Sequence, residues 1–369
     1  MTKNEQDFQK NLDDFLNSEF PDFTKKVCMA VVGKVSAGKS SLINALLQRD
    51  RSDQVCAVGA VSGVTTNVKY IPFDDDVFIV DCPGLDDVKK ENSDVTQEFL
   101  NNIDIGIFVV TGSADESQKE NFDLLKQHTK HTLVVLNKFD EFEKLSKVGQ
   151  EKVIDQWKQV LGVKEIFPTV TEGYDPDYNE ELPLNLKGID DVRDKVIECL
   201  KENKKDILFI KTLKDKRKYV AGIAVTAVLS AVAAAQLPAG GAIITGIQAV
   251  AIASLAYIYT GEILSKKSAL ALLPTFAAES LGSTLYVWAA SLIPTGIINA
   301  TAGVVAGGIT LAMLGAVIAV FEAGGNLDDK SMLSKIFKEI RKTEISISDL
   351  KSFPALSQLL FKILFKSQM

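Results

Sequence analysis

The sequence predicts an α/β domain with a mostly parallel sheet, followed by an all-α domain built from hydrophobic helical hairpins. Between Lys25 and Leu200, apolar strand-like runs alternate with amphipathic stretches, a pattern typical of a parallel sheet covered by helices. From Tyr219 to Phe321 the chain is apolar and rich in Ala and Gly, as in closely packed helices. The two halves of this 369-residue chain are therefore expected to fold differently.

A phosphate-binding loop is the most specific motif. Residues 33–40 read G-x-x-x-x-G-K-S, between a strand-like apolar run and a run with helical spacing. Gly33 and Gly38 would let backbone N–H groups surround phosphate oxygens at a helix N-terminus. Lys39 would reach the β- and γ-phosphates, and Ser40 would hold Mg²⁺. The motif predicts a nucleotide-binding site.

Two further motifs follow predicted strand ends. Asp81, at the start of D-x-x-G, is expected to act on Mg²⁺ through water, and Gly84 to offer its N–H to the γ-phosphate. In Asn137-Lys138-Phe139-Asp140, the Asp140 carboxylate could accept two hydrogen bonds from N1–H and the exocyclic amine of guanine. Adenine offers no such pair of donors, so guanine nucleotides are predicted.

In order and spacing, these motifs resemble the P-loop GTPases of the Era, TrmE and dynamin grouping, over roughly Lys25 to Leu200. The resemblance implies a P-loop GTPase domain and a switch threonine on Mg²⁺, for which we choose Thr65, with Thr66 as the alternative. It also implies that a fifth motif, only weakly matched here, steadies the guanine through Thr171. The residues expected to contact GTP or GDP are Gly33, Val35, Ser36, Ala37, Gly38, Lys39, Ser40, Ser41, Thr65, Asp81, Gly84, Asn137, Lys138, Asp140 and Thr171. Those expected to hold Mg²⁺ are Ser40, Thr65 and Asp81.

Hydrolysis of GTP to GDP is expected to be slow without help. Some GTPases of the wider class place a glutamine after the glycine to orient the attacking water, and Leu85 cannot do this. In the dynamin-like branch, the resembling loop has a serine where this chain has Ser36, and a monovalent cation such as K⁺ and dimerisation across the nucleotide face help catalysis. The residues expected to act on the reacting phosphate are Lys39, Ser36, Thr65 and Gly84. The alternative for Ser36 is a loop serine that bonds a neighbouring backbone group.

The apolar region is predicted to form two helical hairpins. Uncharged runs 220–237 and 242–259 flank Pro238-Ala239-Gly240-Gly241, and runs 269–293 and 297–321 flank Pro294-Thr295-Gly296. Lysines before and between the hairpins would place the GTPase domain at the cytoplasmic face of a membrane, where lipid would be a partner. The turns resemble those of an uncharacterised bacterial hydrophobic (YcjF-like) domain found downstream of Era-like GTPases. A compact soluble bundle is the alternative.

Four segments are expected along the chain: an N-terminal amphipathic helix in 1–24, the GTPase domain in 25–203, the hydrophobic helical domain in 204–326, and amphipathic helices in 327–369. The net charge of −7 argues against nucleic acid as a partner. The acidic turn at 74–76 is expected to be solvated rather than metal-binding.

Together these observations predict a GTP-hydrolysing switch that changes the posture of a membrane-associated helical domain. The alternative is a soluble regulatory GTPase that recruits a protein partner through a helical bundle. A dynamin-like remodelling enzyme is a third possibility, but the hairpins are short for the long stalks of that family.

Overall fold

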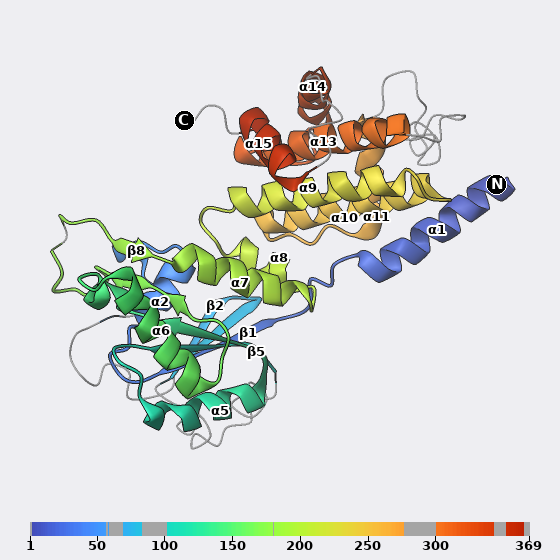
Figure 1. Ribbon diagram of the computed structural model, residues 1–369. Coiled ribbons are helices and arrows are strands. Elements are labelled where there is room, and N and C mark those ends of the chain that lie inside the picture. Colours follow the sequence, from blue (N-terminus) through green and yellow to red (C-terminus); the bar gives the residue numbers. More distant parts are fainter. Residues whose placement is uncertain are drawn as a thin grey trace. The chain divides into compact units, whose positions relative to one another are not determined.

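The computed structural model divides into two compact units, which are described separately. The first, the α/β unit, runs from Thr24 to Asp215; the second, the helical unit, combines the chain up to and including Phe23 with the chain from Lys216 onward. The structure describes residues 2–56, 58, 69–82, 102–179, 181–276, 300–342 and 352–364. Figure 1 shows the helices and strands of each unit.

The α/β unit contains a six-stranded sheet in the order β2-β3-β1-β4-β5-β6. Five neighbouring strands, β3, β1, β4, β5 and β6, run parallel to one another. Strand β2 pairs antiparallel to β3 at one edge of the sheet. The strands are β1 (Val27–Gly33), β2 (Lys69–Asp74), β3 (Val77–Cys82), β4 (Ile103–Val110), β5 (Thr129–Leu136) and β6 (Phe167–Pro168). A small second sheet pairs β7 (Val170–Glu172) with β8 (Asn185–Lys187). The predicted mostly parallel sheet is confirmed.

Helices cover both faces of this sheet (Figure 1). Phe122 on α5 and Trp157 on α6 join the buried apolar cluster on one face, while α2 and α7 pack together on the other. The strands are buried on both faces, which explains why they read as continuous apolar runs. The helices are α2 (Lys39–Leu46), α5 (Lys119–His128), α6 (Lys147–Leu161), α7 (Ile189–Lys201) and α8 (Asp206–Lys211), with short 3₁₀ turns η1 (Arg51–Asp53), η2 (Glu116–Gln118) and η3 (Phe139–Phe142).

The acidic turn between β2 and β3 differs from its prediction. The hairpin itself forms as expected, but Asp76 is buried, with its residue only 8% exposed. Lys211 lies 2.8 Å from Asp74 Oδ1 and also pairs with Asp76, and Lys26 Nζ lies 3.3 Å from Asp76 Oδ1. The prediction of a solvated turn holds for Asp75, which is exposed, but is wrong for Asp76, because lysines distant in the sequence neutralise its carboxylate.

The helical unit contains long apolar helices and shorter amphipathic ones. In the part of the chain that the structure describes, three helices are long and apolar enough to cross a membrane: α9 (Arg217–Ala234), α10 (Gly240–Thr260) and residues 302–322 of α13 (Ala300–Glu322). Within the most apolar 18-residue window of each helix, 44% of the window is buried in α9, whereas 78% is buried in α10 and in α13. The other helices are α1 (Lys3–Glu19), α11 (Lys266–Leu272), the 3₁₀ turn η4 (Leu273–Phe276), α14 (Lys330–Arg341) and α15 (Phe353–Leu364).

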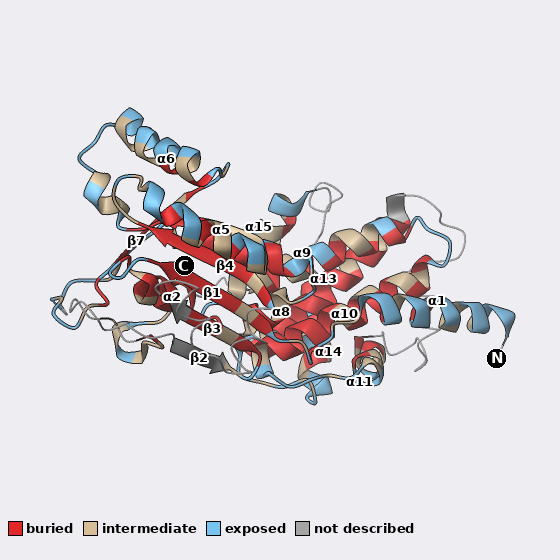
Figure 2. Ribbon diagram, turned by 90° about the horizontal axis from the view of Figure 1, so that it is seen from below, coloured by how far each residue is buried: buried red, intermediate tan, exposed pale blue. Residues whose placement is uncertain are grey.

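The amphipathic helices pack onto the apolar ones. Leu12 and Leu16 of α1 are buried against α10, and α14 and α15 contact α13. Figure 2 shows buried residues along α10 and α13, and exposed ones along the outer side of α1. Amphipathic helices therefore cover much of the apolar surface that the sequence assigns to this region.

The structure contains the first of the two predicted hairpins, but the second differs from its prediction. The first is present as α9 and α10, joined by a turn in which Ala239 has φ +62°. The first arm of the second hairpin is not one helix, because α11 ends at Leu272 and a 3₁₀ turn contains Pro274, which cannot donate a helical hydrogen bond. Most of the rest of that arm and its turn lie outside the described residues.

Candidate nucleotide-binding site

The phosphate-binding loop spans the five residues between β1 and α2. Two of them have left-handed backbone: Gly38 with φ +82° and Ser36 with φ +64°. A Cβ on Gly38 would lie 2.3 Å from Asn137 Nδ2, so both the conformation and the space require glycine. Likewise, a Cβ on Gly33 would lie 2.2 Å from the carbonyl oxygen of Val109 on β4. The loop can wrap a phosphate closely because no side chain intrudes at these two positions.

Lys39 begins α2 and is 4% exposed. Its Nζ donates to the carbonyl oxygen of Lys34, 3.1 Å away, so the ammonium lies across the loop that it follows. Ser40 is half-buried and Ser41 buried beside it, Ala37 is buried, and Val35 and Ser36 are exposed on the outer side. A buried cation held by a backbone carbonyl is suited to exchange that partner for a phosphate oxygen.

Asn137 connects the phosphate loop to the segment expected to read the base. It is fully buried, and its Nδ2 donates to the Ala37 carbonyl oxygen at 3.0 Å and to Thr171 Oγ1 at 2.9 Å. Thr169 Oγ1 donates to Asn137 Oδ1 at 3.0 Å. The structure therefore brings together three predicted regions: the loop, the Asn137 motif and Thr171.

Sequence reasoning missed Thr169, which is 1% exposed. Its backbone also fixes the motif, because Phe139 N donates to Thr169 O at 3.0 Å and Thr169 N donates to Leu136 O at 2.9 Å. A threonine two residues before Thr171 carries no recognisable signal by itself. Its position becomes meaningful only when β6 pairs with β5.

In the rest of the Asn137 motif, Phe139 packs against the buried apolar cluster, while Lys138 and Asp140 lie nearer the surface. Lys138 is exposed with φ +57°, and Asp140 is half-buried in the first turn of η3. Lys187 of β8 pairs with Glu143 nearby, which lies just past this turn. Asp140 is thus accessible for hydrogen bonding to a base.

The predicted metal and γ-phosphate residues are only partly described. The backbone of Asp81 pairs with Val31, two residues before Gly33, where β1 ends and the phosphate loop follows. Thr65, Thr66 and Gly84 lie outside the described residues. Among the residues that the structure describes, no group of three or more His, Cys, Asp and Glu could hold a metal ion.

Asn44 on α2 is a second residue missed from the sequence. It is fully buried; its Oδ1 accepts from Val55 N at 2.9 Å and Cys56 N at 3.0 Å, and its Nδ2 donates to Cys56 O at 2.9 Å. One amide thus anchors the chain that leads toward Thr65 to the helix that begins with Lys39. An asparagine in an otherwise apolar helical stretch is the only available sequence signal.

Lys34 is a third residue whose contacts were missed from the sequence. It pairs with Asp115, which caps η2 beyond the end of β4, and its Nζ lies 3.4 Å from Ser117 Oγ. The hydrogen bond from Lys34 is the main cause that lowers the pKa of Asp115 to about 2. The carboxylate is therefore charged at neutral pH, and the loop is tied to the chain beyond β4.

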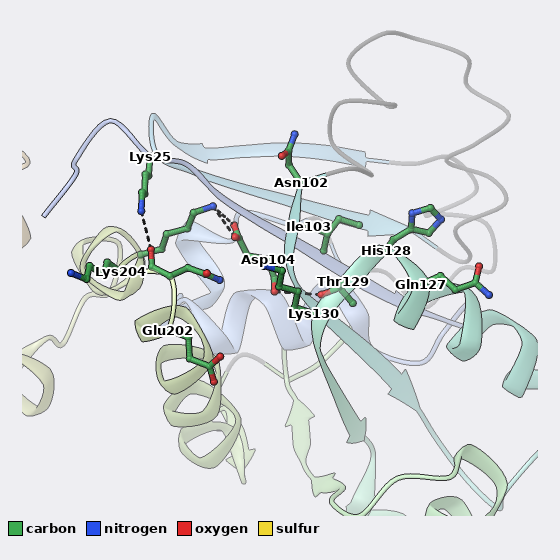
Figure 3. A pocket seen from close by; sticks show the side chains of 12 residues that line it. Lys25, Asn102, Ile103, Asp104, Gln127, His128, Thr129, Lys130, Glu202 and Lys204 are labelled. Atoms are coloured by element: carbon green, nitrogen blue, oxygen red, sulfur yellow. Dashed lines mark hydrogen bonds and ion pairs between the residues drawn. The ribbon is translucent and has the colours of Figure 1, made fainter. Parts of the chain in front are cut away.

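A depression of about 700 Å³ lies where strands β4 and β5 begin, whereas the phosphate loop follows the end of β1 (Figure 3). It is lined by polar side chains, and Lys205 Nζ there lies 2.7 and 2.8 Å from the two Asp104 carboxylate oxygens. None of the predicted nucleotide-binding residues lines it. We assign the nucleotide to the phosphate loop instead, because the loop has the chemistry that phosphate requires.

Comparisons with known proteins concern the α/β unit. Residues 28–138 match the family described as 50S ribosome-binding GTPase. Residues 28–138 therefore belong to a P-loop GTPase domain. The chain is 32% identical over 176 residues to GTPase Der of Bacteroides fragilis, covering 43% of this chain and 38% of that protein. It is 33% identical over 151 residues to the tRNA modification GTPase MnmE of Carboxydothermus hydrogenoformans, covering 38% of this chain and 30% of that protein.

Among solved structures, this GTPase domain is similar to Era in complex with MgGDPNP and nucleotides 1506–1542 of 16S ribosomal RNA. The identity is 25%, the TM-score 0.28, and the match covers 40% of this chain and 51% of that chain. The chain spans about a third of the length of the curated relatives it matches, from 30% to 38%. The family match ends at residue 138, so it does not extend to the helical unit.

Proposed function

We propose that this protein binds and hydrolyses GTP and that its nucleotide state controls the helical unit at a membrane. The observation that carries the nucleotide part is Asn137, which joins the phosphate loop to the base-side segment through Ala37 and Thr171. One buried amide thereby sets the spacing between the place for the phosphates and the place for the base.

In this proposal Asp140 accepts hydrogen bonds from guanine, and Lys39 neutralises the β- and γ-phosphates. The donor set fits Mg²⁺, since Ser40 supplies a half-buried hydroxyl beside Lys39 and the backbone of Asp81 lies next to β1. Ser40, Asp81 and Thr65 would hold Mg²⁺, which neutralises charge on the phosphates. Because Leu85 cannot orient water, the intrinsic rate should be slow.

The base specificity is tested with Asp140→Asn. The variant should lose affinity for GTP and gain affinity for xanthosine triphosphate, because xanthine has a carbonyl where guanine has its exocyclic amine. Titration of both nucleotides against both proteins measures the change. Glu141→Gln, one residue further along η3, is the matched control. An unchanged preference for GTP in Asp140→Asn would remove Asp140 from the base site.

We further propose that Ser36 supports hydrolysis together with K⁺ in a homodimer formed across the nucleotide face. Ser36 is exposed and its backbone is left-handed, a conformation that costs a non-glycine residue free energy and that is often kept at functional sites. Turnover measured in K⁺ and in Na⁺ across a protein concentration series tests this. A rate per molecule that depends on neither cation nor concentration would contradict it.

For the helical unit we propose membrane association, which α9 supports. It is an uncharged helix after its first two residues, and less than half of its most apolar window is buried. The basic residues before it would then lie on the cytoplasmic side, together with the GTPase domain. We expect no nucleic acid partner, because the net charge is −7.

The deeper burial of α10 and α13 favours the second candidate, a soluble GTPase that recruits a protein through this unit. Fractionation of the full chain, with an alkaline wash of the membrane pellet, separates the two. Retention in the washed pellet supports insertion. Recovery in the soluble fraction supports a folded bundle, and the search would then turn to proteins that bind only the GTP state.

A further inference from the structure

The segment from Lys211 to Asp215, here called the linker, ends the α/β unit and continues directly into α9. The structure holds it from two sides. On the first side, Lys211 bridges Asp74 and Asp76 of the β2–β3 turn, with Nζ 2.8 Å from Asp74 Oδ1. Its side chain is only 12% exposed and that of Asp76 is 11% exposed, so this ion pair is partly shielded from water.

On the second side, the linker contacts the chain that follows α2. Lys214 Nζ lies 2.7 Å from Asp50 Oδ2 and 2.8 Å from Asp53 Oδ2. Asp215 N donates to Gln48 Oε1 at 2.7 Å, and Arg49 donates to the carbonyl oxygen of Thr212 at 3.1 Å. The hydrogen bond from Lys214 is the main cause that lowers the pKa of Asp53, so this pair is charged at neutral pH.

The two sides have a common feature in the sequence. Gln48 to Asp53 precede the segment that contains Thr65, and the β2–β3 turn lies between Thr65 and Gly84. Thr65 and Gly84 are the residues proposed to sense the γ-phosphate. The linker is therefore attached at two points. One point precedes the segment that carries Thr65; the other is the β2–β3 turn, which follows that segment and leads through β3 to Gly84.

We propose that the linker transmits the nucleotide state from these two attachment points to the helical unit. This inference rests on the proposed function. Among the strands that the structure describes, β2 pairs only with β3, at the edge of the sheet, so within this sheet β3 alone fixes the register of β2. A register change of one residue moves a strand by about 3.3 Å, enough to separate Lys211 from Asp74. The ion pair can therefore exist in one nucleotide state and be broken in the other.

The experiment is hydrogen exchange of the full chain, loaded with GDP or with a non-hydrolysable GTP analogue. Peptides from 217–234 should exchange at different rates in the two states of the wild type. In Lys211→Met, which keeps the alkyl chain but removes the charge, this difference should be lost, while affinity for both nucleotides stays within about threefold. Asp74→Asn removes the more exposed partner and should have the same effect, which guards against misfolding of the first variant.

Lys205→Met is the matched control. Lys205 and Asp104 form a pair of similar length and burial, drawn with dashed lines in Figure 3, but Asp104 is on β4 and borders neither attachment point. This control should keep the nucleotide-dependent difference. A Lys211→Met protein that also keeps it overturns the inference. A wild type that binds GTP without any difference in 217–234 overturns the inference alone, whereas a wild type that binds no guanine nucleotide overturns the proposed function as well.

Discussion

The two units use buried polar side chains in different ways. In the α/β unit, Asn44, Asn137 and Arg193 each bond to another segment of the chain; Arg193, for example, donates to the carbonyl oxygens of Ala45 and Leu46 at the end of α2. In the described part of the helical unit, Thr245 and Ser254 bond within their own helix, and Gln248 donates to Thr310 across helices at 3.0 Å. Specific hydrogen bonds position the loops of the first unit, while apolar packing dominates the second.

Because of this difference, we expect substitutions to change the stability of the two units differently. Loss of a buried hydrogen-bond partner leaves an unsatisfied polar group, whereas an apolar core tolerates volume-conserving changes. The α/β unit should therefore be sensitive at single amides, and the helical unit sensitive mainly to shape.

The largest effect is expected for Lys39→Ala. It removes the buried cation of the phosphate loop, so the affinity for GTP should fall at least about 100-fold, equivalent to about 2.7 kcal/mol. Titration with a fluorescent GTP analogue measures it. Lys34→Ala, an exposed lysine of the same loop, is the control and should weaken binding less than tenfold. Tight binding by Lys39→Ala would mean that this loop does not hold the nucleotide.

Asn137→Ala should lower the free energy of unfolding of the α/β unit by about 2–4 kcal/mol, because Thr169 and the Ala37 carbonyl oxygen lose a buried partner. Urea denaturation in the absence of nucleotide measures the loss. The exposed Asn179→Ala serves as a control and should change stability by less than about 0.5 kcal/mol. Equal stability of the two variants would show that the Asn137 network does not hold the loops.

Gly246→Ala should destabilise the packing of α1 on α10 by about 1–3 kcal/mol, because the new Cβ would lie 2.3 Å from Phe15 Cδ1. Gly222→Ala on α9 is the matched control, since the nearest atom to its Cβ, in Phe353, is 3.8 Å away. That control should be neutral or slightly stabilising, because alanine favours helices. Thermal unfolding compares the two, and adding Phe15→Ala to Gly246→Ala should remove the steric part of the cost.

The smallest effect is expected for the double substitution Gln248→Leu and Thr310→Val. It replaces both partners of the buried interhelical bond by apolar groups of similar shape, so stability should change by less than about 1 kcal/mol. Thr310→Val alone should cost about 1–3 kcal/mol, because it removes the hydroxyl that accepts the buried hydrogen bond from Gln248 Nε2. If the double variant is as unstable as the single one, the helical unit depends on this polar pair more than the comparison suggests.

Much of the fold follows from local patterns. The phosphate-loop motif at 33–40, the strand β3 that contains Asp81 and the apolar helices were predictable, because hydrophobic period, glycine geometry and motif spacing act over a few residues. The amphipathic helices at both ends of the chain were predicted for the same reason. Local sequence patterns thus predicted most of the described strands and helices, although not the break between α11 and η4, and they predict where a phosphate would bind.

Only the tertiary structure decided which distant groups meet. Thr169 next to Asn137, Asn44 against Cys56, Lys211 on Asp76, and Phe15 against Gly246 are pairs whose members carry no mutual signal in the sequence. The burial of Asp76 shows the physical reason. A carboxylate is stable inside a fold only when a cation is brought to it, and that cation comes from Lys211, on a helix at the far end of the unit.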